Sequence, residues 1–99
     1  YALHLLFLWL PSPELAIARV AQRVRAGVHH VPDDVVRRRY NRGLRNFFEL
    51  YRPLATRWRI FDSTRLSRPP LIVEGGPDNE RVCRKRVWDD MLRGVGRDR

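Results

Sequence analysis

The sequence predicts an α/β fold in which helices are layered on a sheet. Three observations support this class: a continuous apolar run at residues 3–10, helical periodicity over residues 13–25 and 33–51, and two short apolar runs at 58–63 and 70–76. The order strand, helix, helix, strand, strand, helix suits part of a layered α/β domain and does not suit an all-helical DNA-binding module. The 99 residues suffice for one domain at most.

The first segment, residues 1–27, should hold a strand and a helix. Residues 3–10 are apolar apart from one histidine, as in a strand of a parallel sheet that is covered on both faces. This run is too short to span a bilayer and lacks the flanks of a signal peptide. Ser12 is a suitable cap for a helix over residues 13–25, which Gly27 should end. The residues expected on the inner face of this helix are Ile17, Val20, Ala21 and Val24.

The second segment, residues 28–56, should carry a longer helix that begins at Asp33. The two aspartates there suit the positive end of a helix dipole. Pro53 should end or kink this helix, because proline cannot donate a backbone hydrogen bond. The apolar residues that recur at helical spacing, and should therefore face the core, are Val36, Tyr40, Leu44, Phe47 and Tyr51.

Residues 57–76 should form two short strands joined by a polar connection that contains proline. Asp62 and Glu74 lie at the ends of these strands, and we expect structural roles for both. Residues 77–99 should form an amphipathic helix over 79–92, followed by a frayed tail. The residues expected to face inward from this helix are Val82, Val87 or Trp88, and Met91.

The formal net charge of +9 indicates an anionic partner such as nucleic acid, anionic lipid or phosphate. Lys85 is nevertheless the only lysine. A coding bias toward GC-rich codons would give the same arginine excess without any partner. The positions of the arginines must therefore decide whether their charge serves a partner. The single cysteine, Cys83, excludes an internal disulfide framework and a cysteine-rich zinc site. It suits the reducing cytoplasm.

Three arginines form a stripe along the second predicted helix. Arg38, Arg42 and Arg45 are spaced at i, i+4 and i+7, on a line distinct from the apolar face. Like charges at this spacing repel by a few tenths of a kcal/mol per pair, so an anion that neutralises them would stabilise the helix. The alternative is a solvated face in which Asp34 and Glu49 neutralise part of the charge.

Residues 6–63 contain the run FLWLPSPELAIARVAQRVRAGVHHVPDDVVRRRYNRGLRNFFELYRPLATRWRIFDS. This run resembles the C-terminal half of the zeta-toxin-like P-loop proteins, a group often called predicted ABC-type ATPases. In that family a strand ending in LP and a SPEL helix lead into R-V-x-x-G-G-H-x-V-P, followed by R-R-Y-x-R and L-Y-x-P-L. LIVEGG also resembles the closing strand of the family. The resemblance covers about residues 6–76.

The resemblance implies the C-terminal part of a P-loop NTPase-like layered domain. Segment 28–56 would be a lid that brings arginines over the phosphates of ATP, with Mg²⁺ as the second cofactor. Guanidinium groups suit this role, because they bind the oxygens of a transferring phosphoryl group in bidentate fashion. The family pattern assigns catalytic contacts to Arg38 and Arg39, and nucleotide contacts to Arg23, Arg42 and His29.

Other residues in this segment have weaker assignments. His29 could orient the lid loop or contact substrate, and a hydrogen-bonded structural histidine is the alternative. Arg25, Arg37 and Arg45 match the family pattern less clearly and are assigned as surface charges. The partners that the resemblance implies are a nucleotide, a small-molecule acceptor and an antitoxin-like protein, without a membrane and without nucleic acid.

The sequence departs from the family pattern in two places. Val28 replaces the second glycine, which would strain or reshape the turn if that position needs a positive φ. The phosphate-loop pattern G-x-x-x-x-G-K-[ST] is absent from the 99 residues. Because the chain also begins at Tyr1, inside an apolar run, we expect it to be a fragment without a metal site of its own and inactive alone.

Two other functions compete with this interpretation. The chain could be a small basic module that contacts RNA or DNA through its arginine helix, with Tyr40 or Trp58 stacking on bases. It carries no nucleic-acid-binding motif, and Tyr40 lies on the predicted apolar face. The chain could also be a remnant without any activity.

Overall fold

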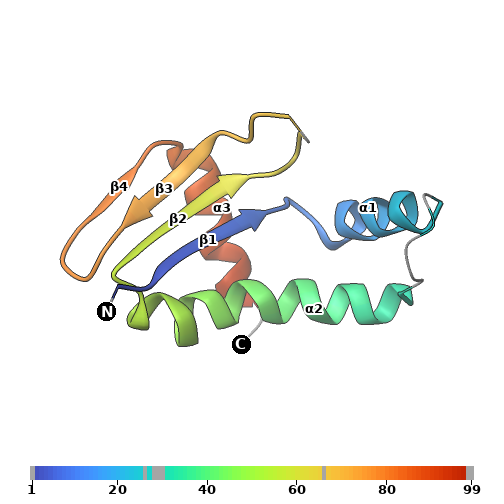
Figure 1. The fold of residues 1–99 in the computed structure, drawn as a ribbon, viewed down its shortest axis with the longest axis horizontal. Helices are drawn as coiled ribbons and strands as arrows, with labels where there is room; N and C mark the ends of the chain where they lie inside the picture. The colour runs from blue at the N-terminus through green and yellow to red at the C-terminus, as the bar shows by residue number, and fades with distance from the viewer. Residues whose placement is uncertain (1, 26, 28–30, 66, 98–99) are drawn as a thin grey trace.

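A computed structural model describes residues 2–25, 27, 31–65 and 67–97 (Figure 1). Within them the chain is an α/β domain with a mixed four-stranded sheet and three α-helices. The elements in order are β1 (His4–Trp9), α1 (Pro13–Arg25), α2 (Asp33–Asn46), the π-helical turn η1 (Phe47–Tyr51), the 3₁₀ turn η2 (Arg52–Leu54), β2 (Arg57–Asp62), β3 (Leu71–Gly75), β4 (Glu80–Val82) and α3 (Lys85–Arg97).

The strands lie in the order β1-β2-β3-β4. β1 and β2 are parallel and in register from His4 opposite Arg57 to Trp9 opposite Asp62. The two other strand pairs are antiparallel. A parallel pair needs a long crossover between its strands, and α1 and α2 supply it. The prediction that residues 3–10 form a strand of a parallel pair is therefore confirmed.

Helix α1 has the predicted bounds, and both of its ends follow from local chemistry. The Ser12 Oγ accepts a hydrogen bond from the backbone N–H of Leu15 at 3.2 Å, which satisfies one of the free donors of the first turn. Gly27 has a φ of 95°, in the left-handed region where glycine is favoured after a helix. On the inner face Ile17 and Val20 are half-buried, whereas Ala21 is exposed.

Helix α2 begins at Asp33 as predicted and buries Val36 and Leu44, but its last turns differ from a regular helix. The backbone widens into η1, and Phe47 and Phe48 are buried there. A π turn holds an extra residue, so the positions after it rotate around the helix axis. The prediction that Tyr51 faces the core is therefore wrong, since its exposed fraction is 51%.

The core lies on one face of the sheet, where α3 crosses behind the strands (Figure 1) and Phe47 of η1 packs against Phe7 of β1 and Trp58 of β2. Aromatic rings from these elements contact each other: Phe47 and Trp58 have centroids 6.1 Å apart, and Trp58 and Trp88 are stacked at 6.5 Å. The buried residues of this cluster are Trp9, Leu44, Phe47, Phe48, Ala55, Trp58, Ile60, Ile72, Val73, Trp88 and Met91.

The opposite face of the sheet, here called the outer face, has no helix over it among the residues that the structure describes (Figure 1). Leu6 and Leu8 point to this face from β1 and have exposed fractions of 69% and 62%. The prediction that the first strand is covered on both faces is therefore wrong for the described chain. β1 also lies at the edge of the sheet, with one side unpaired.

This exposed strand should make the chain self-associate, because flat apolar edge strands pair with other chains. Leu6→Lys combined with Leu8→Lys should lower the average mass of the 99-residue protein in sedimentation equilibrium toward that of the monomer. Leu54→Lys is the matched control, since Leu54 is 72% exposed but lies in η2, outside the sheet. A wild-type chain that is monomeric at high micromolar concentration would contradict the prediction.

The C-terminal segment differs most from the sequence prediction. Residues 79–84, which should have been helical, form β4 and the turn before α3. The N–H of Gly76 donates to the carbonyl of Asn79 at 2.9 Å, and this turn brings Arg81 opposite Glu74. Strand pairing therefore overrides helix periodicity there. α3 extends to Arg97, beyond the predicted end at 92, and Trp88 and Met91 are buried as predicted.

Candidate functional site

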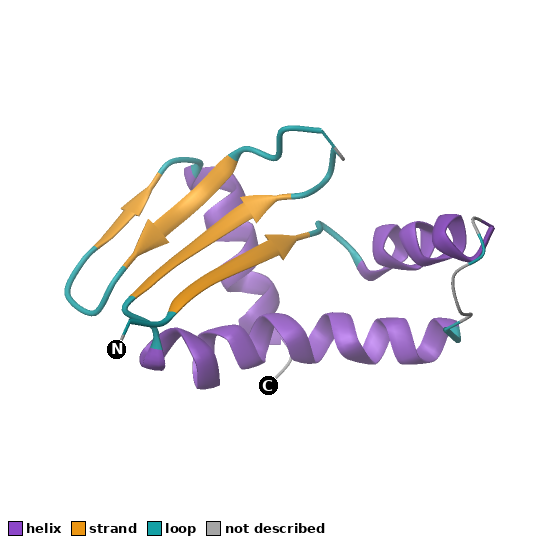
Figure 2. Cartoon of the chain, in the orientation of Figure 1, coloured by secondary structure: helices purple, strands orange, loops and turns teal. Residues whose placement is uncertain are grey.

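Ligands of α/β proteins commonly bind at the carboxyl ends of parallel strands. In this chain two loops leave the carboxyl ends of β1 and β2, at residues 10–12 and at 63–70, where Leu66 lies outside the described residues (Figure 2). Helix α1 packs along α2, and both extend past this end of the sheet (Figure 1). The carboxyl end of the parallel pair is therefore the place where strands, loops and both crossover helices meet.

Backbone carbonyls hold these elements together. The N–H of Ser63 donates to the carbonyl of Trp9 at 2.8 Å, which joins the end of β2 to the end of β1. The hydroxyl of Tyr40 donates to the carbonyl of Leu10 at 2.6 Å, which fixes the middle of α2 beside β1. Arg19 of α1 donates to the carbonyls of Ser63 and Thr64 at 2.5 and 2.7 Å. One end of the sheet thus positions α1, α2 and the loop that follows β2.

Replacing Arg19 by alanine should loosen the loop after β2. Its charged guanidinium donates three hydrogen bonds to this loop, two of them to backbone carbonyls, and bonds from a charged donor contribute about 1.5–3 kcal/mol each. We expect hydrogen exchange of the amides at residues 63–65 to accelerate by roughly tenfold or more, since tenfold corresponds to about 1.4 kcal/mol. Arg23→Ala, in the same helix and exposed, should leave these amides unchanged. Equal exchange in both variants would show that Arg19 does not hold the loop.

The structure places Arg38, Arg39 and Arg42 on the exposed surface of α2. Among the described residues, no acidic side chain forms an ion pair with any of the three. Arg37 differs, because it pairs with Glu14 of α1 at 3.0 Å. Hydrogen bonds from the backbone N–H of Glu14 and from Arg37 hold the pKa of the Glu14 carboxyl below its ordinary value. Arg37 therefore joins the two crossover helices, whereas the other three have no acidic partner within the described part of the chain.

The two arginines predicted to be catalytic do not point the same way. Neighbouring residues of an α-helix are rotated by about 100°, so Arg38 lies opposite the buried side of α2 while Arg39 lies at its flank. Arg39 lines a small groove of about 180 Å³ with Gly43, with residues 7–9 of β1 and with Leu10, which follows the strand. Only Arg39 of the predicted pair is therefore placed beside the carboxyl end of β1.

The other residues that were predicted to contact the nucleotide do not lie together beside β1. Arg23 is exposed on α1, and Arg42 follows Arg38 along the outward side of α2. His29 and Val28, and with them the altered glycine position, lie outside the described residues. Arg45 is half-buried instead of being a free surface charge. The structure thus brings Arg39 to the end of the sheet and leaves Arg38, Arg42 and Arg23 facing solvent.

A second group of arginines was missed by the sequence analysis. Arg65, Arg68 and Arg84 line a cleft of about 660 Å³ beside the loop 63–70, together with Asp62, Thr64, Ser67 and Pro70. Asp62 has the structural role expected of it, since it accepts hydrogen bonds from the N–H and the hydroxyl of Thr64. The basic run TRLSR directly after the predicted strand at residues 58–63 was the available signal for this cleft.

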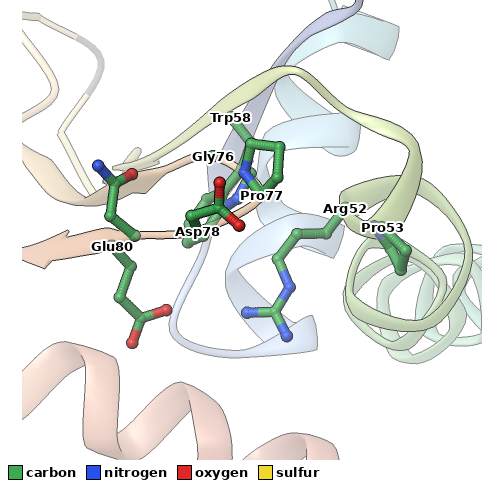
Figure 3. Close-up of a pocket in the computed structure, with 8 residues that line it drawn as sticks. Arg52, Pro53, Trp58, Gly76, Pro77, Asp78 and Glu80 are labelled. Carbon is green, nitrogen blue, oxygen red and sulfur yellow. The ribbon is translucent and has the colours of Figure 1, made fainter.

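A third cleft, of about 520 Å³, lies at the amino end of β2 (Figure 3). Arg52 lines it on one side, with Asp78 and Glu80 on the other. The Arg52 guanidinium lies 4.7 Å from the ring centre of Phe48 and 5.4 Å from that of Trp58, so it forms cation–π contacts with the core. This cleft is at the opposite end of the parallel pair from the arginines of α2.

Over residues 2–25, 27, 31–65 and 67–97, no group of three or more histidine, cysteine, aspartate or glutamate side chains could hold a metal ion. The Mg²⁺ that the sequence resemblance implies therefore finds no ligand set in the described chain. No described helix is long and apolar enough to cross a bilayer.

The fold and the arginine groups define an α/β domain with free positive charge at the carboxyl end of its parallel strands. The chain was compared with family models, with curated proteins and with solved structures, and none of them matches it.

Proposed function

We propose that the chain binds the phosphates of a nucleotide through the arginines of α2, as part of an ATP-dependent phosphotransferase or ATPase similar to the zeta toxins. The observation that carries the proposal is the bond between Tyr40 and the Leu10 carbonyl, which holds α2 against the carboxyl end of β1. Arg39 then faces the groove beside β1, and neither it nor Arg38 or Arg42 is neutralised by a described acidic residue.

In this function the arginines stabilise the negative charge of the transferring phosphoryl group. When a terminal phosphoryl group moves from ATP to an acceptor oxygen, the bond from phosphorus to the bridging oxygen of ADP breaks and a bond to the acceptor forms. Negative charge spreads over the three other phosphoryl oxygens during this step, and fixed guanidinium groups stabilise it. Arg39 is the residue best placed for this role, while Arg38 and Arg42 would raise the local positive potential.

The reaction also needs a phosphate loop and Mg²⁺. The 99 residues contain no phosphate-loop motif. We therefore expect the purified chain to bind nucleotide phosphates weakly and to show no Mg²⁺-dependent hydrolysis of ATP in a phosphate-release assay. A measurable ATPase rate that depends on Mg²⁺ would contradict the expectation that these 99 residues do not hydrolyse ATP alone.

The binding proposal can be tested on the chain itself. Isothermal titration with ATP should show a dissociation constant that rises at least about tenfold when Arg38, Arg39 and Arg42 are all replaced by alanine, since tenfold corresponds to about 1.4 kcal/mol. Arg57→Ala is the matched control, because Arg57 is exposed and lies at the start of β2, at the other end of the parallel pair. Equal affinities in the triple variant and the control would refute the proposal.

The competing function, nucleic-acid binding, receives less support from the described side chains. Trp58 is only 3% exposed, and Tyr40 is half-buried with its hydroxyl bonded to Leu10. Trp58 therefore presents no free face to a base, and Tyr40 is anchored against the end of β1. We expect binding to duplex DNA to be weak, without sequence preference, and to fade steeply with salt in filter-binding assays. Tight binding at physiological salt that survives competitor DNA would favour the competing function.

A further inference from the structure

We propose that the cleft between the loop 63–70 and the start of α3 binds the phosphate group of a small phosphorylated molecule, at a site separate from the arginines of α2. The cleft lies at the carboxyl end of β2, and its volume of about 660 Å³ is in the range of small-molecule sites. The proposal depends on the geometry of this loop and not on the function proposed for α2.

The first argument is charge. Arg65 and Arg68 come from the loop and Arg84 comes from the turn before α3, so two segments distant in sequence bring three guanidinium groups to one cleft. Each is exposed, and none forms an ion pair with an acidic side chain among the described residues. Asp62 is the carboxylate in the lining, so the described lining carries three positive charges against one negative charge. The cleft therefore has an excess of positive charge.

The second argument is the first turn of α3. The carbonyl of Arg84 accepts the first hydrogen bond of this helix, from the N–H of Trp88 at 3.0 Å. Lys85 and Arg86 follow directly, and no acidic residue occupies the first turn. Positive side chains at the positive end of a helix dipole are unfavourable, whereas an anion there is stabilising. A bound phosphate would offset the repulsion that the sequence builds into this helix start.

The third argument is preorganisation of the loop. Asp62 N–H donates to the carbonyl of Pro70 at 2.9 Å, which closes the loop at its base, and Arg19 holds its first residues from α1. Arg68 has a φ of 51°, a left-handed conformation that a non-glycine residue adopts at a free-energy cost. Such strain is typical of binding sites, where the surrounding bonds hold a residue in one orientation.

The arrangement suits phosphate better than a carboxylate. A phosphate monoester carries up to two charges and three oxygens free to accept hydrogen bonds. Three guanidinium groups and the hydroxyl of Ser67 line the cleft and supply donors for such a group. The cleft has further room beyond the phosphate, so the ligand class is a small phosphorylated molecule.

Pyrophosphate is the probe for this site, and the readout is isothermal titration at 150 mM salt, where exposed charges are largely screened beyond about 8 Å. We expect saturable binding that weakens at least tenfold in Arg68→Gly and in Arg84→Ala. Arg68→Gly is informative because glycine relieves the left-handed strain, so a loss of binding cannot be attributed to a destabilised fold. Acetate at the same concentrations should not compete.

The α2 triple variant at Arg38, Arg39 and Arg42 is the matched control, and it should retain pyrophosphate binding at the loop. Absent saturation in the wild-type chain, competition by acetate, or equal losses in the loop and α2 variants would each overturn the proposal. Because the α2 variants test nucleotide binding and the loop variants test this cleft, either proposal can fail while the other stands.

Discussion

Replacing Arg39 by alanine should lower the rate of phosphoryl transfer about a hundredfold or more, as expected for the loss of a group that stabilises transition-state charge. The measurement requires a protein in which this chain is joined to a half that carries a phosphate loop. The same change should leave the unfolding midpoint nearly unaltered, because Arg39 is exposed and has no ion-pair partner among the described residues.

Arg38→Ala and Arg45→Ala complete this experiment. The resemblance to the zeta-toxin-like family predicts a similar, hundredfold loss for Arg38 and little change for Arg45. The position of Arg39 beside β1 makes it the stronger candidate of the pair, since Arg38 faces solvent. Equal and mild effects of all three substitutions would mean that α2 carries a solvated basic surface and does not contact phosphates.

The parts of the fold that the sequence predicts well are those set by local chemistry. Ser12 and Gly27 mark the ends of α1 because a cap side chain and a left-handed glycine act within one turn of the chain. The apolar spacing along α2 likewise identifies the buried Val36 and Leu44. Each of these predictions depends on neighbours at most a few residues away.

The failures concern features that depend on distant segments. Residues 80–82 pair with β3 although their spacing suits a helix, because the turn after Gly76 places them beside an open strand edge. Tyr51 leaves the core because η1 adds a residue to the helix turn, which periodicity does not reveal. Leu6 and Leu8 are exposed because the described chain has no layer over the outer face, although the apolar run predicts one.

The candidate site also combines features set by local spacing with features that depend on distant segments. The arginine stripe on α2 could be predicted from spacing, but the direction of Arg39 toward β1 follows from the bond between Tyr40 and Leu10, which lie 30 positions apart. The cleft around Arg65, Arg68 and Arg84 needs two segments that meet only because β3 and β4 form a hairpin. Sequence spacing alone could not have grouped these residues.

Replacing Trp58 by alanine should have the largest effect on stability, a loss of about 3–5 kcal/mol in the free energy of unfolding. Trp58 is 3% exposed, stacks on Trp88 and meets the edge of Phe47, while Arg52 lies over its ring. Its ring also lies against Gly75, where an added Cβ would lie 2.7 Å from a Trp58 ring atom. Alanine would leave a cavity that these neighbours cannot all fill.

Urea unfolding followed by far-UV circular dichroism measures this loss. A domain of this size has a total stability of about 5–15 kcal/mol, so the Trp58→Ala protein should unfold at a much lower urea concentration or fail to fold.

Gly75→Ala tests the same contact from the other side. Its Cβ would lie 2.7 Å from the Asn79 carbonyl oxygen, which belongs to the backbone, so we expect a loss of about 1–3 kcal/mol even though the substitution is small. Leu54→Ala is the control, because Leu54 is 72% exposed and its truncation should change stability by no more than about 0.5 kcal/mol. If Gly75→Ala were as stable as the wild type, Trp58 would not pack tightly against the β3–β4 hairpin, and the predicted loss for Trp58→Ala would be too large.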